Sequence, residues 1–401
     1  MADKAQTSAT QPKVVLACAT FKGTLSSKAA GEALARGLQS AGVVTQVIGL
    51  ADGGEGLVDA LSAQVEGALK VGAPARCPLQ KPRTATFAML PALKTPQKKE
   101  TGVIRKVPTA IIEMAASSGL TLVPEGQRDP KIATSLGVGD QILAALEQQR
   151  DELEIVLGIG GSATNDGGAG MAQALGAKLL DAKGLPIEPG GAALLKLARI
   201  DISEMNKRAQ TVPVTVACDV NNPLCGPNGA SYVFGKQKGG SPDDLKLLDD
   251  ALANYARVIK KDLGRDVANV PGAGAAGGLG AGCLAFLNAK LRPGIELVLD
   301  VLEFDRVLDG AVLVITGEGG LDDQTLMGKA PAGVAARAAR KGIKTMAIGG
   351  GIDRAHEAEL KKVFARIESL SDFAGGPEAA MRETARFLEN LAKAKAGEWL
   401  S

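Results

Sequence analysis

The chain has 401 residues, and its 46 lysines and arginines nearly balance its 44 aspartates and glutamates, so the formal net charge is only +2. This balance argues against a nucleic-acid-binding protein that relies on bulk charge, and no apolar run reaches the roughly 18–20 residues of a membrane-spanning helix. Glycine is abundant, with 51 residues, and aromatic residues make up 3%, which favours an α/β fold of two domains over a β-sandwich or a coiled coil.

The first 60 residues alternate between strand and helix signals. Residues 1–12 are polar and predict a disordered tail. An apolar run at 14–17 predicts a strand, the stretch from Ser26 to about Gly42 has the apolar spacing of a helix, and 43–50 predicts a second strand. The second strand ends in Ala-Asp-Gly-Gly-Glu-Gly at 51–56. Parallel strands present such acids at the carboxyl edge of a sheet, where ligands usually bind.

The rest of the chain reads as two further regions. Prolines recur through residues 67–108, which predicts strands and loops of a different domain. Further strands are predicted at 110–114, 155–157, 212–217, 312–315 and 345–348, and helices at 138–149, 171–175, 241–264, 283–287 and 331–342. This alternation predicts a parallel, doubly wound sheet at both ends of the chain.

The glycine-dense loop 158–170, Gly-Ile-Gly-Gly-Ser-Ala-Thr-Asn-Asp-Gly-Gly-Ala-Gly, joins a predicted strand to a predicted helix. Backbone amides in such a loop can point at an anion. The loop also contains hydroxyl, amide and carboxylate groups at Ser162, Thr164, Asn165 and Asp166. Glycines combined with these groups predict a polar binding site rather than a tight turn alone.

The cysteines and the histidine limit which disulfides and metal sites the chain can form. Five cysteines are scattered without metal-ligand or disulfide spacing, so we expect reduced, mostly buried thiols and a cytoplasmic protein. The single histidine, His356, cannot form a multi-histidine metal site. Carboxylates beside glycine loops therefore fit phosphate and Mg²⁺ chemistry, because Mg²⁺ prefers oxygen ligands.

Two nucleotide-binding motifs, the P-loop and the dinucleotide fingerprint, bear on the function of the glycine-rich segments. A P-loop would need glycine at 323 and a hydroxyl at 330, where the chain has Asp323 and Ala330. The glycines and alanine at 158, 160 and 163 fit a looser dinucleotide fingerprint, with Asp181 roughly where a ribose-binding acid would lie. An NAD(P)-dependent oxidoreductase is therefore the alternative enzyme, although Asp166 places an acid where a pyrophosphate would approach.

The loop 158–170 closely resembles the signature loop of the glycerate kinase type 1 family. Further blocks of this family are recognisable in the expected order over about residues 14 to 350. They are 21–23, 51–56, 112–116, 217–227, 271–278, 316–319 and 324–331.

The resemblance implies an ATP-dependent kinase that uses Mg²⁺ to phosphorylate D-glycerate, with the 2-hydroxyl favoured over the 3-hydroxyl. It also implies a Rossmann- or flavodoxin-like domain built from 13–60 and 290–401, with a second α/β domain, 61–289, inserted. The site is expected between these domains. No nucleic-acid or membrane partner is expected, and a homodimer is left open.

The resemblance implies roles for the residues that match the family's motifs. The catalytic candidates are Asp166, Asp322 and Lys22, with Asp166 preferred as the base. The metal candidates are Asp219 and Glu318. The substrate- and nucleotide-binding candidates are Asp52, Glu55, Gly160, Gly161, Ser162, Thr164, Asn165, Gly277, Gly278, Gln324, Thr325 and Lys329.

Two departures from the family pattern are visible. The family usually has Asp-Ser before Phe-Lys-Gly, where this chain has Ala19-Thr20, and an arginine where this chain has Gly320. Their loss predicts weaker binding or a changed substrate, and makes a catalytically impaired, ligand-binding homologue the non-enzyme alternative. An active kinase is favoured because the other loops are intact.

Overall fold

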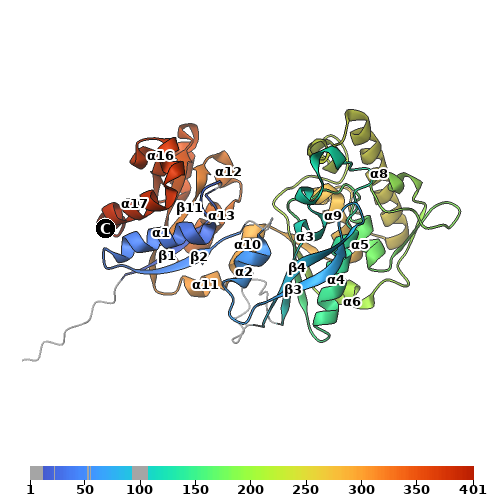
Figure 1. Cartoon of the computed structure of the whole chain (residues 1–401), viewed down its shortest axis with the longest axis horizontal. Coiled ribbons are helices and arrows are strands. Elements are labelled where there is room, and N and C mark those ends of the chain that lie inside the picture. Colours follow the sequence, from blue (N-terminus) through green and yellow to red (C-terminus); the bar gives the residue numbers. More distant parts are fainter. Residues whose placement is uncertain (1–11, 22, 52–53, 55, 93–106) are drawn as a thin grey trace, which may run out of the picture. The chain divides into compact units, whose positions relative to one another are not determined.

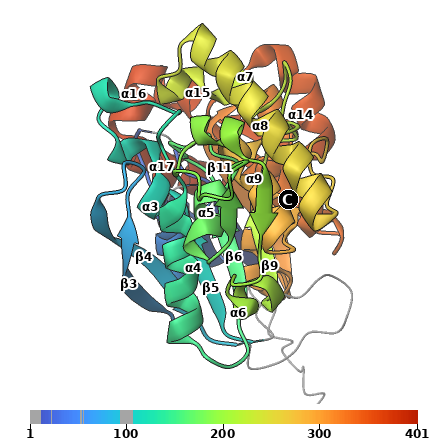
Figure 2. The ribbon, with the colours of Figure 1, turned by 90° about the vertical axis from the view of Figure 1, so that its right-hand side faces the viewer.

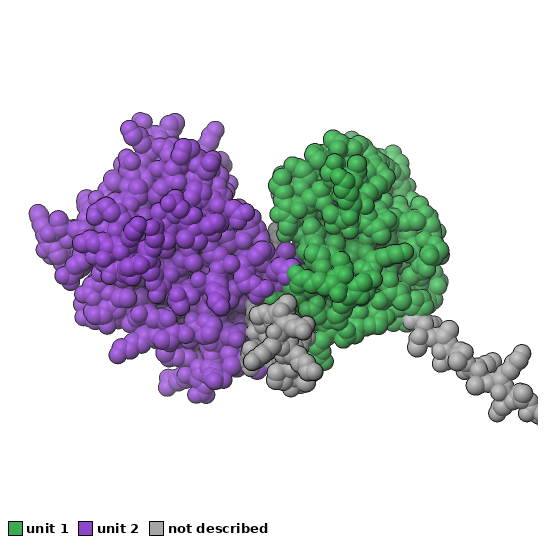
Figure 3. All heavy atoms as spheres, turned by 180° about the vertical axis from the view of Figure 1, so that it is seen from behind, with its two compact units in different colours: residues 1–52, 298–401 green, residues 53–297 purple. Residues whose placement is uncertain are grey.

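The computed structural model describes residues 12–21, 23–51, 54, 56–92 and 107–401 (Figure 1). Almost all of the predicted tail, together with Lys22, Asp52 and Glu55, lies outside these residues. The chain divides into two compact units, residues 1–52 with 298–401 and residues 53–297 (Figure 3). The predicted domain limits at 60 and 290 stay a prediction, and each unit is described by itself.

The first unit contains an all-parallel sheet in the order β13-β12-β11-β1-β2. Its strands are β1 (Lys13–Cys18), β2 (Val44–Gly49), β11 (Ala311–Leu321), β12 (Lys344–Ile352) and β13 (Arg366–Ser369). Because side chains alternate along a strand, neighbouring residues enter different cores. Ile348 belongs to the core that α1 (Ser27–Gln39) and α17 (Thr384–Trp399) complete, and Ala347 belongs to the core that contains residues of α13 (Ala330–Ala339) and α14 (Glu357–Val363). The predicted parallel, doubly wound sheet is confirmed in this unit.

Strands β11 and β12 are longer than predicted. We expected loops to begin at residues 316 and 349, but pairing continues to Leu321 and Ile352. The glycines of these segments allow the strands to lie close together. A Cβ on Gly317 would lie 2.6 Å from the Ile348 carbonyl oxygen, and one on Gly350 would lie 2.4 Å from the Gly319 carbonyl oxygen.

The second unit contains a mixed six-stranded sheet in the order β10-β9-β6-β5-β4-β3 (Figure 2). Its strands are β3 (Leu69–Arg76), β4 (Pro82–Leu90), β5 (Thr109–Glu113), β6 (Glu154–Gly158), β9 (Val214–Ala217) and β10 (Lys290–Arg292). Strands β10, β9, β6 and β5 are parallel, whereas β3 and β4 form an antiparallel pair. The change in sequence character after residue 67 corresponds to this antiparallel pair.

Eight α-helices described in the second unit are α2 (Leu57–Ser62), α3 (Ala115–Ser118), α4 (Leu136–Gln148), α5 (Ala169–Ala174), α6 (Lys207–Thr211), α7 (Ala230–Phe234), α8 (Pro242–Leu263) and α9 (Ala275–Phe286). Helix α8 begins at a capping box formed by Ser241 and Asp244 and ends at Gly264, as predicted. Tyr255 of α8 stacks on Phe286 of α9 with a ring-centroid distance of 6.5 Å. A small antiparallel pair, β7 (Lys178–Leu180) and β8 (Arg199–Asp201), lies outside the main sheet.

The remaining α-helices that the structure describes are α10 (Gly294–Val301), α11 (Phe304–Val307), α12 (Asp323–Leu326), α15 (Leu370–Ala374) and α16 (Pro377–Arg382). Within the described residues, every helix is too short or too polar to span a membrane. The five cysteines are free thiols, of which Cys18 and Cys283 are buried.

Candidate functional site

The carboxyl ends of β5, β6 and β9 lie at one edge of the second unit's sheet, because these neighbouring strands are parallel. Glu113 ends β5, the loop 158–170 follows β6, and Asp219 follows β9. Gly54 reaches the same edge, since a Cβ on Gly160 would lie 2.7 Å from the Cα of Gly54. Two sequence segments that were predicted to bind ligand therefore meet here.

The side chains of the loop 158–170 are mostly buried. Gly161 is exposed and Gly160 is half-buried, whereas Ser162 is 9% exposed and Thr164, Asn165 and Asp166 are fully buried. In this conformation, solvent reaches the backbone of Gly160 and Gly161 but not the side chains of residues 164–166. The loop therefore offers a ligand its glycine backbone first.

Asp166 accepts five hydrogen bonds. Its Oδ2 accepts from the Ser135 backbone N–H (2.7 Å), the Ser135 hydroxyl (2.9 Å), the Thr134 hydroxyl (3.2 Å) and the Gly170 N–H (3.2 Å), and its Oδ1 accepts from the Gly168 N–H (3.1 Å). Gly168 and Gly170 belong to the first turn of α5, where a carboxylate is favoured by the helix dipole. This geometry favours a role for Asp166 in holding the loop together.

Lys238 is a buried cation that the sequence reasoning missed. It ends the 3₁₀ helix η4 (Lys236–Lys238), its side chain is 1% exposed, and its Nζ donates to the Thr164 carbonyl oxygen at 2.7 Å. Burial lowers the pKa of Lys238 to about 7, although the nearby negative charge of Asp166 opposes this shift. Its setting in Gly-Lys-Gln-Lys-Gly-Gly resembles an ordinary solvated turn, so no sequence pattern distinguishes it from a surface lysine.

The second glycine-dense segment packs directly on the same loop. Helix α9 contains three successive left-handed residues, Ala276 (φ 55°), Gly277 (φ 68°) and Gly278 (φ 90°). A Cβ on Gly277 would lie 1.9 Å from the Thr164 carbonyl oxygen, and one on Gly278 would lie 2.8 Å from the Cα of Gly167. We had expected these glycines to contact substrate or nucleotide, and the observed contacts give them a packing role as well.

Three polar side-chain atoms in the loop 158–170 or on helix α8 are buried without a hydrogen-bond partner in the described part of the chain. They are the Thr164 hydroxyl, the Asn165 Oδ1 and the Tyr255 hydroxyl. The amide nitrogen of Asn165 donates to the Ser231 hydroxyl at 2.9 Å. Buried polar groups in proteins are usually paired, so the polar interactions of this region are incomplete among the described residues.

Asp219, a predicted metal ligand, is an exposed residue just beyond β9. Its Oδ1 accepts a 2.7 Å hydrogen bond from the Gly294 N–H at the start of α10. This contact fixes the direction of the carboxylate.

The first unit brings together a separate group of predicted residues after β11. The Thr325 hydroxyl donates to Glu318 Oε1 at 2.7 Å, and Asp322 caps α12 by accepting from the Thr325 N–H at 3.1 Å. Lys329 Nζ lies 3.8 Å from Asp322 Oδ1, and Gln324 is exposed. Unlike Asp166, Asp322 has an accessible side chain, which is 38% exposed.

The two departures lie near the carboxyl ends of adjacent strands of the first unit, Ala19 just beyond β1 and Gly320 within β11. Beyond β1, the Ala19 N–H donates to the Gly317 carbonyl oxygen at 2.8 Å, and Gly320 is an exposed residue of β11. From β1 and β11 the chain proceeds to opposite sides of the sheet, to β2 and to β12. Ligands of open α/β sheets usually bind at such a switch point, at the carboxyl ends of the strands.

The residues fit a magnesium ion better than zinc. Across the described residues there is no cluster of three or more histidine, cysteine, aspartate or glutamate side chains that could hold a metal. Mg²⁺ does not need such a cluster, because it commonly takes one or two protein carboxylates and completes its shell with phosphate and water oxygens. Asp219 and Glu318 supply oxygen donors of this kind.

The alternative interpretation as a dinucleotide-binding protein relied on Asp181 as the acid that binds a ribose. Asp181 Oδ1 accepts from the backbone N–H groups of Lys183 (2.8 Å) and Leu185 (2.9 Å), so it stabilises the turn that follows β7. This side chain is therefore engaged in a local turn away from the main sheet.

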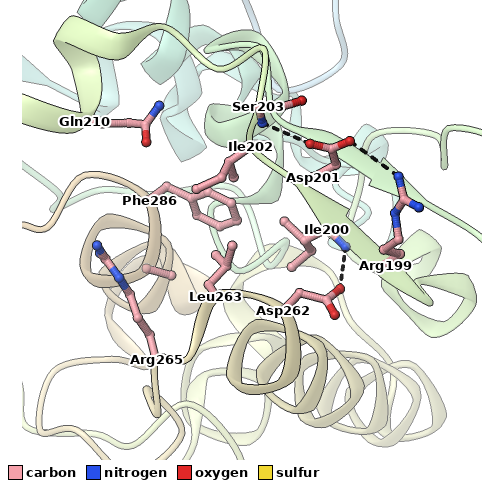
Figure 4. A pocket seen from close by; sticks show the side chains of 11 residues that line it. Arg199, Ile200, Asp201, Ile202, Ser203, Gln210, Asp262, Leu263, Arg265 and Phe286 are labelled. Atoms are coloured by element: carbon pink, nitrogen blue, oxygen red, sulfur yellow. Dashed lines mark hydrogen bonds and ion pairs between the residues drawn. The ribbon is translucent and has the colours of Figure 1, made fainter.

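A hollow of about 640 Å³ in the second unit contains none of the predicted site residues (Figure 4). Its charged groups are already engaged. Arg199 pairs with Asp201 at 3.4 Å, Asp262 accepts from the Ile200 N–H, and Arg265 donates to the Leu284 carbonyl oxygen. These contacts stabilise the fold locally and give no indication of a ligand.

Comparisons with known proteins agree with the resemblance. The model of the glycerate kinase family matches residues 14–400. A glycerate kinase from Bacillus cereus is 41% identical over 389 residues, which cover 96% of this chain and 98% of that protein, and the Escherichia coli glycerate 2-kinase is 42% identical over 95% of this chain and 97% of its own length. A Salmonella typhimurium crystal structure assigned as a glycerate kinase 2 has a TM-score of 0.79 and 39% identity, and the match covers 97% of this chain and 100% of that one. The chain belongs to the glycerate kinase family.

Proposed function

We propose that the protein is an ATP-dependent kinase that phosphorylates glycerate to 2-phosphoglycerate. The match to the glycerate kinase family over residues 14–400 is the observation that supports this activity most strongly, and the relative named glycerate 2-kinase supports the position of phosphorylation. The D-enantiomer as substrate, a cytoplasmic location and a homodimer stay predictions.

The proposed binding roles follow the two groups of residues. The exposed backbone of Gly160 and Gly161 is suited to an anion, because glycine loops after a strand direct amides toward phosphate or carboxylate groups. Lys329 would neutralise phosphate charge. Asp219 of the second unit and Glu318 of the first unit are each a candidate ligand for Mg²⁺, which would neutralise charge on the transferred phosphoryl group.

Two carboxylates are candidates for the base that accepts the hydroxyl proton. Asp166 was preferred from the sequence, but its carboxylate is fully buried and accepts five hydrogen bonds. Asp322 is accessible and lies near Lys329. A general base must reach the proton that it removes, so the geometry supports Asp322 over Asp166.

The proposal is tested by a coupled assay of ADP release with D-glycerate, ATP and Mg²⁺, in which ³¹P NMR identifies the phosphoglycerate isomer. Glycerate-dependent turnover that yields the 2-isomer is expected. Asp322→Asn should lose turnover while still binding ATP, and Asp181→Asn, which alters only the turn after β7, serves as the matched control. ATP binding without turnover of the unmodified protein would favour the impaired homologue, and glycerate oxidation with NAD(P) would favour the oxidoreductase.

A further inference from the structure

Burial of the Lys238 ammonium requires a compensating contact, because an isolated charge is unfavourable in a protein interior. Lys236 and Gln237 of the same short helix η4 are exposed, whereas Lys238 is 1% exposed. The contact that the structure shows is the 2.7 Å hydrogen bond from Lys238 Nζ to the Thr164 carbonyl oxygen. The side chain therefore binds the glycine loop from its buried side.

The Thr164 carbonyl oxygen is enclosed by a second segment. Gly277 approaches so closely that a Cβ there would lie 1.9 Å from this oxygen, and the Gly277 carbonyl oxygen accepts from the Gly167 N–H at 3.0 Å. Lys238 and Gly277 thus contact the same peptide group. Its orientation depends on a cation supplied by η4 and on a left-handed turn supplied by α9.

The charge of Asp166 favours the protonated form of Lys238. Asp166 is the charged group whose field raises the pKa of Lys238 against the lowering effect of burial. Tyr255 of α8, on which the charge of Asp166 also acts, stays neutral because burial raises its pKa. Asp166 is therefore the charged group that acts on the Lys238 ammonium here.

We propose that Lys238 is a positioning residue for phosphoryl transfer, which fixes the Thr164 carbonyl group and thereby the shape of the loop 158–170 without touching the reacting atoms. This inference rests on the proposed kinase function. It predicts that the exposed backbone at Gly160 and Gly161 is presented correctly only while a buried donor occupies position 238. Small displacements of positioning groups are enough to lower a rate by orders of magnitude.

The test compares Lys238→Met, which keeps an unbranched side chain one atom shorter and removes its donor, with Lys238→Arg, which keeps a cationic donor. Lys236→Met, in the same helix η4 but exposed, is the matched control. Each protein is assayed for kcat and for KM with D-glycerate and ATP, and hydrogen exchange is measured for peptides that cover residues 159–171. The expected result is a fall of at least tenfold in kcat/KM for Lys238→Met, with a raised KM, faster exchange in this segment, and recovery in Lys238→Arg.

The outcomes separate the inference from the proposed function. Partial unfolding alone would lower kcat without changing KM, so a raised KM identifies altered positioning. A folded Lys238→Met protein with kcat and KM within twofold of the unmodified chain overturns the inference. If Lys238→Met does not fold, the Lys238→Arg variant is the test. Turnover within tenfold of the unmodified chain then supports the inference. Lost turnover with a loop 158–170 that is still protected from exchange, or failure of this variant to fold, overturns it. Absence of glycerate-dependent turnover in the unmodified protein and in Lys236→Met would instead refute the kinase function.

Discussion

The carboxylate of Asp166 lies 2.7 Å from the backbone nitrogen of Ser135, which joins two segments that are 31 residues apart in the chain. Three backbone N–H groups and two hydroxyls converge on this one side chain. Hydrogen bonds to a buried charge are individually stronger than neutral ones. Asp166 is therefore expected to stabilise the loop even if it takes no part in the chemistry.

Asp166→Asn separates these two roles. An amide nitrogen would replace one acceptor oxygen and face donors, so we expect the free energy of unfolding to fall by about 3 kcal/mol or more. Urea unfolding and kcat at saturating ATP are the measurements, and Ser135→Ala, which removes one donor and leaves the carboxylate, is the comparison. A variant of unchanged stability and abolished turnover would show instead that Asp166 is the base, and normal stability with normal turnover would contradict both roles.

The lowered pKa of Lys238 predicts that the stability of the folded chain depends on pH. Its folded-state pKa is about 7, below the ordinary value of 10.5, so between these values the unfolded chain binds more protons than the folded chain. The unfavourable burial of the charge is complete below pH 7 and is relieved as the pH rises, which adds stability at up to about 1.4 kcal/mol per pH unit.

Unfolding free energies between pH 6.5 and 7.5 measure this effect. Above this range the thiols of Cys18, Cys225 and Cys283 act in the opposite direction, because their pKa values are raised to about 12 in the folded chain and they begin to ionise only in the unfolded chain. Lys238→Met should lose the upward slope and Lys236→Met should keep it. Equal slopes in the two variants would show that Lys238 is not the group that titrates.

The sequence predicted the elements better than it predicted the contacts of individual site residues. Alternating strands and helices, and the start and end of α8 at Ser241 and Gly264, are local patterns that can be read directly. Strand β11 was cut short in the prediction because glycine usually marks a loop, whereas here its lack of a side chain permits close strand pairing. Lys238 was missed because its partner is a backbone carbonyl group 74 residues away, and no side-chain pattern records such a contact.

Gly277→Ala should disrupt the packing of α9 on the glycine loop. The added methyl group would lie 1.9 Å from the Thr164 carbonyl oxygen, and the position has a φ of 68°, which is unfavourable for alanine. We expect a loss of about 3 kcal/mol or more in stability, since neither backbone segment can move without breaking its own contacts. Thermal unfolding of this variant is compared with that of Gly264→Ala, which has the same φ of 68° but no heavy atom within 4 Å of the added Cβ. Equal losses in the two variants would show that backbone strain, and not the contact with Thr164, sets the effect.

Gly320→Arg places an arginine at the position where the sequence departs from the pattern that it resembles. Gly320 is exposed, and an added Cβ would meet no heavy atom within 4 Å, so a longer side chain can be accommodated without displacing β11. An arginine can bind a carboxylate or phosphate group through two parallel hydrogen bonds. Because Gly320 is exposed and an exposed ion pair is worth at most about 1 kcal/mol, we expect KM for glycerate or ATP to fall by about threefold. Gly320→Gln, which fills the same space without a charge, is the control, and an equal KM in the two variants would mean that position 320 does not face an anionic substrate. A lower KM in the arginine variant alone would place the carboxyl end of β11 at the bound ligand and explain the departure at this position as a loss of affinity rather than of chemistry.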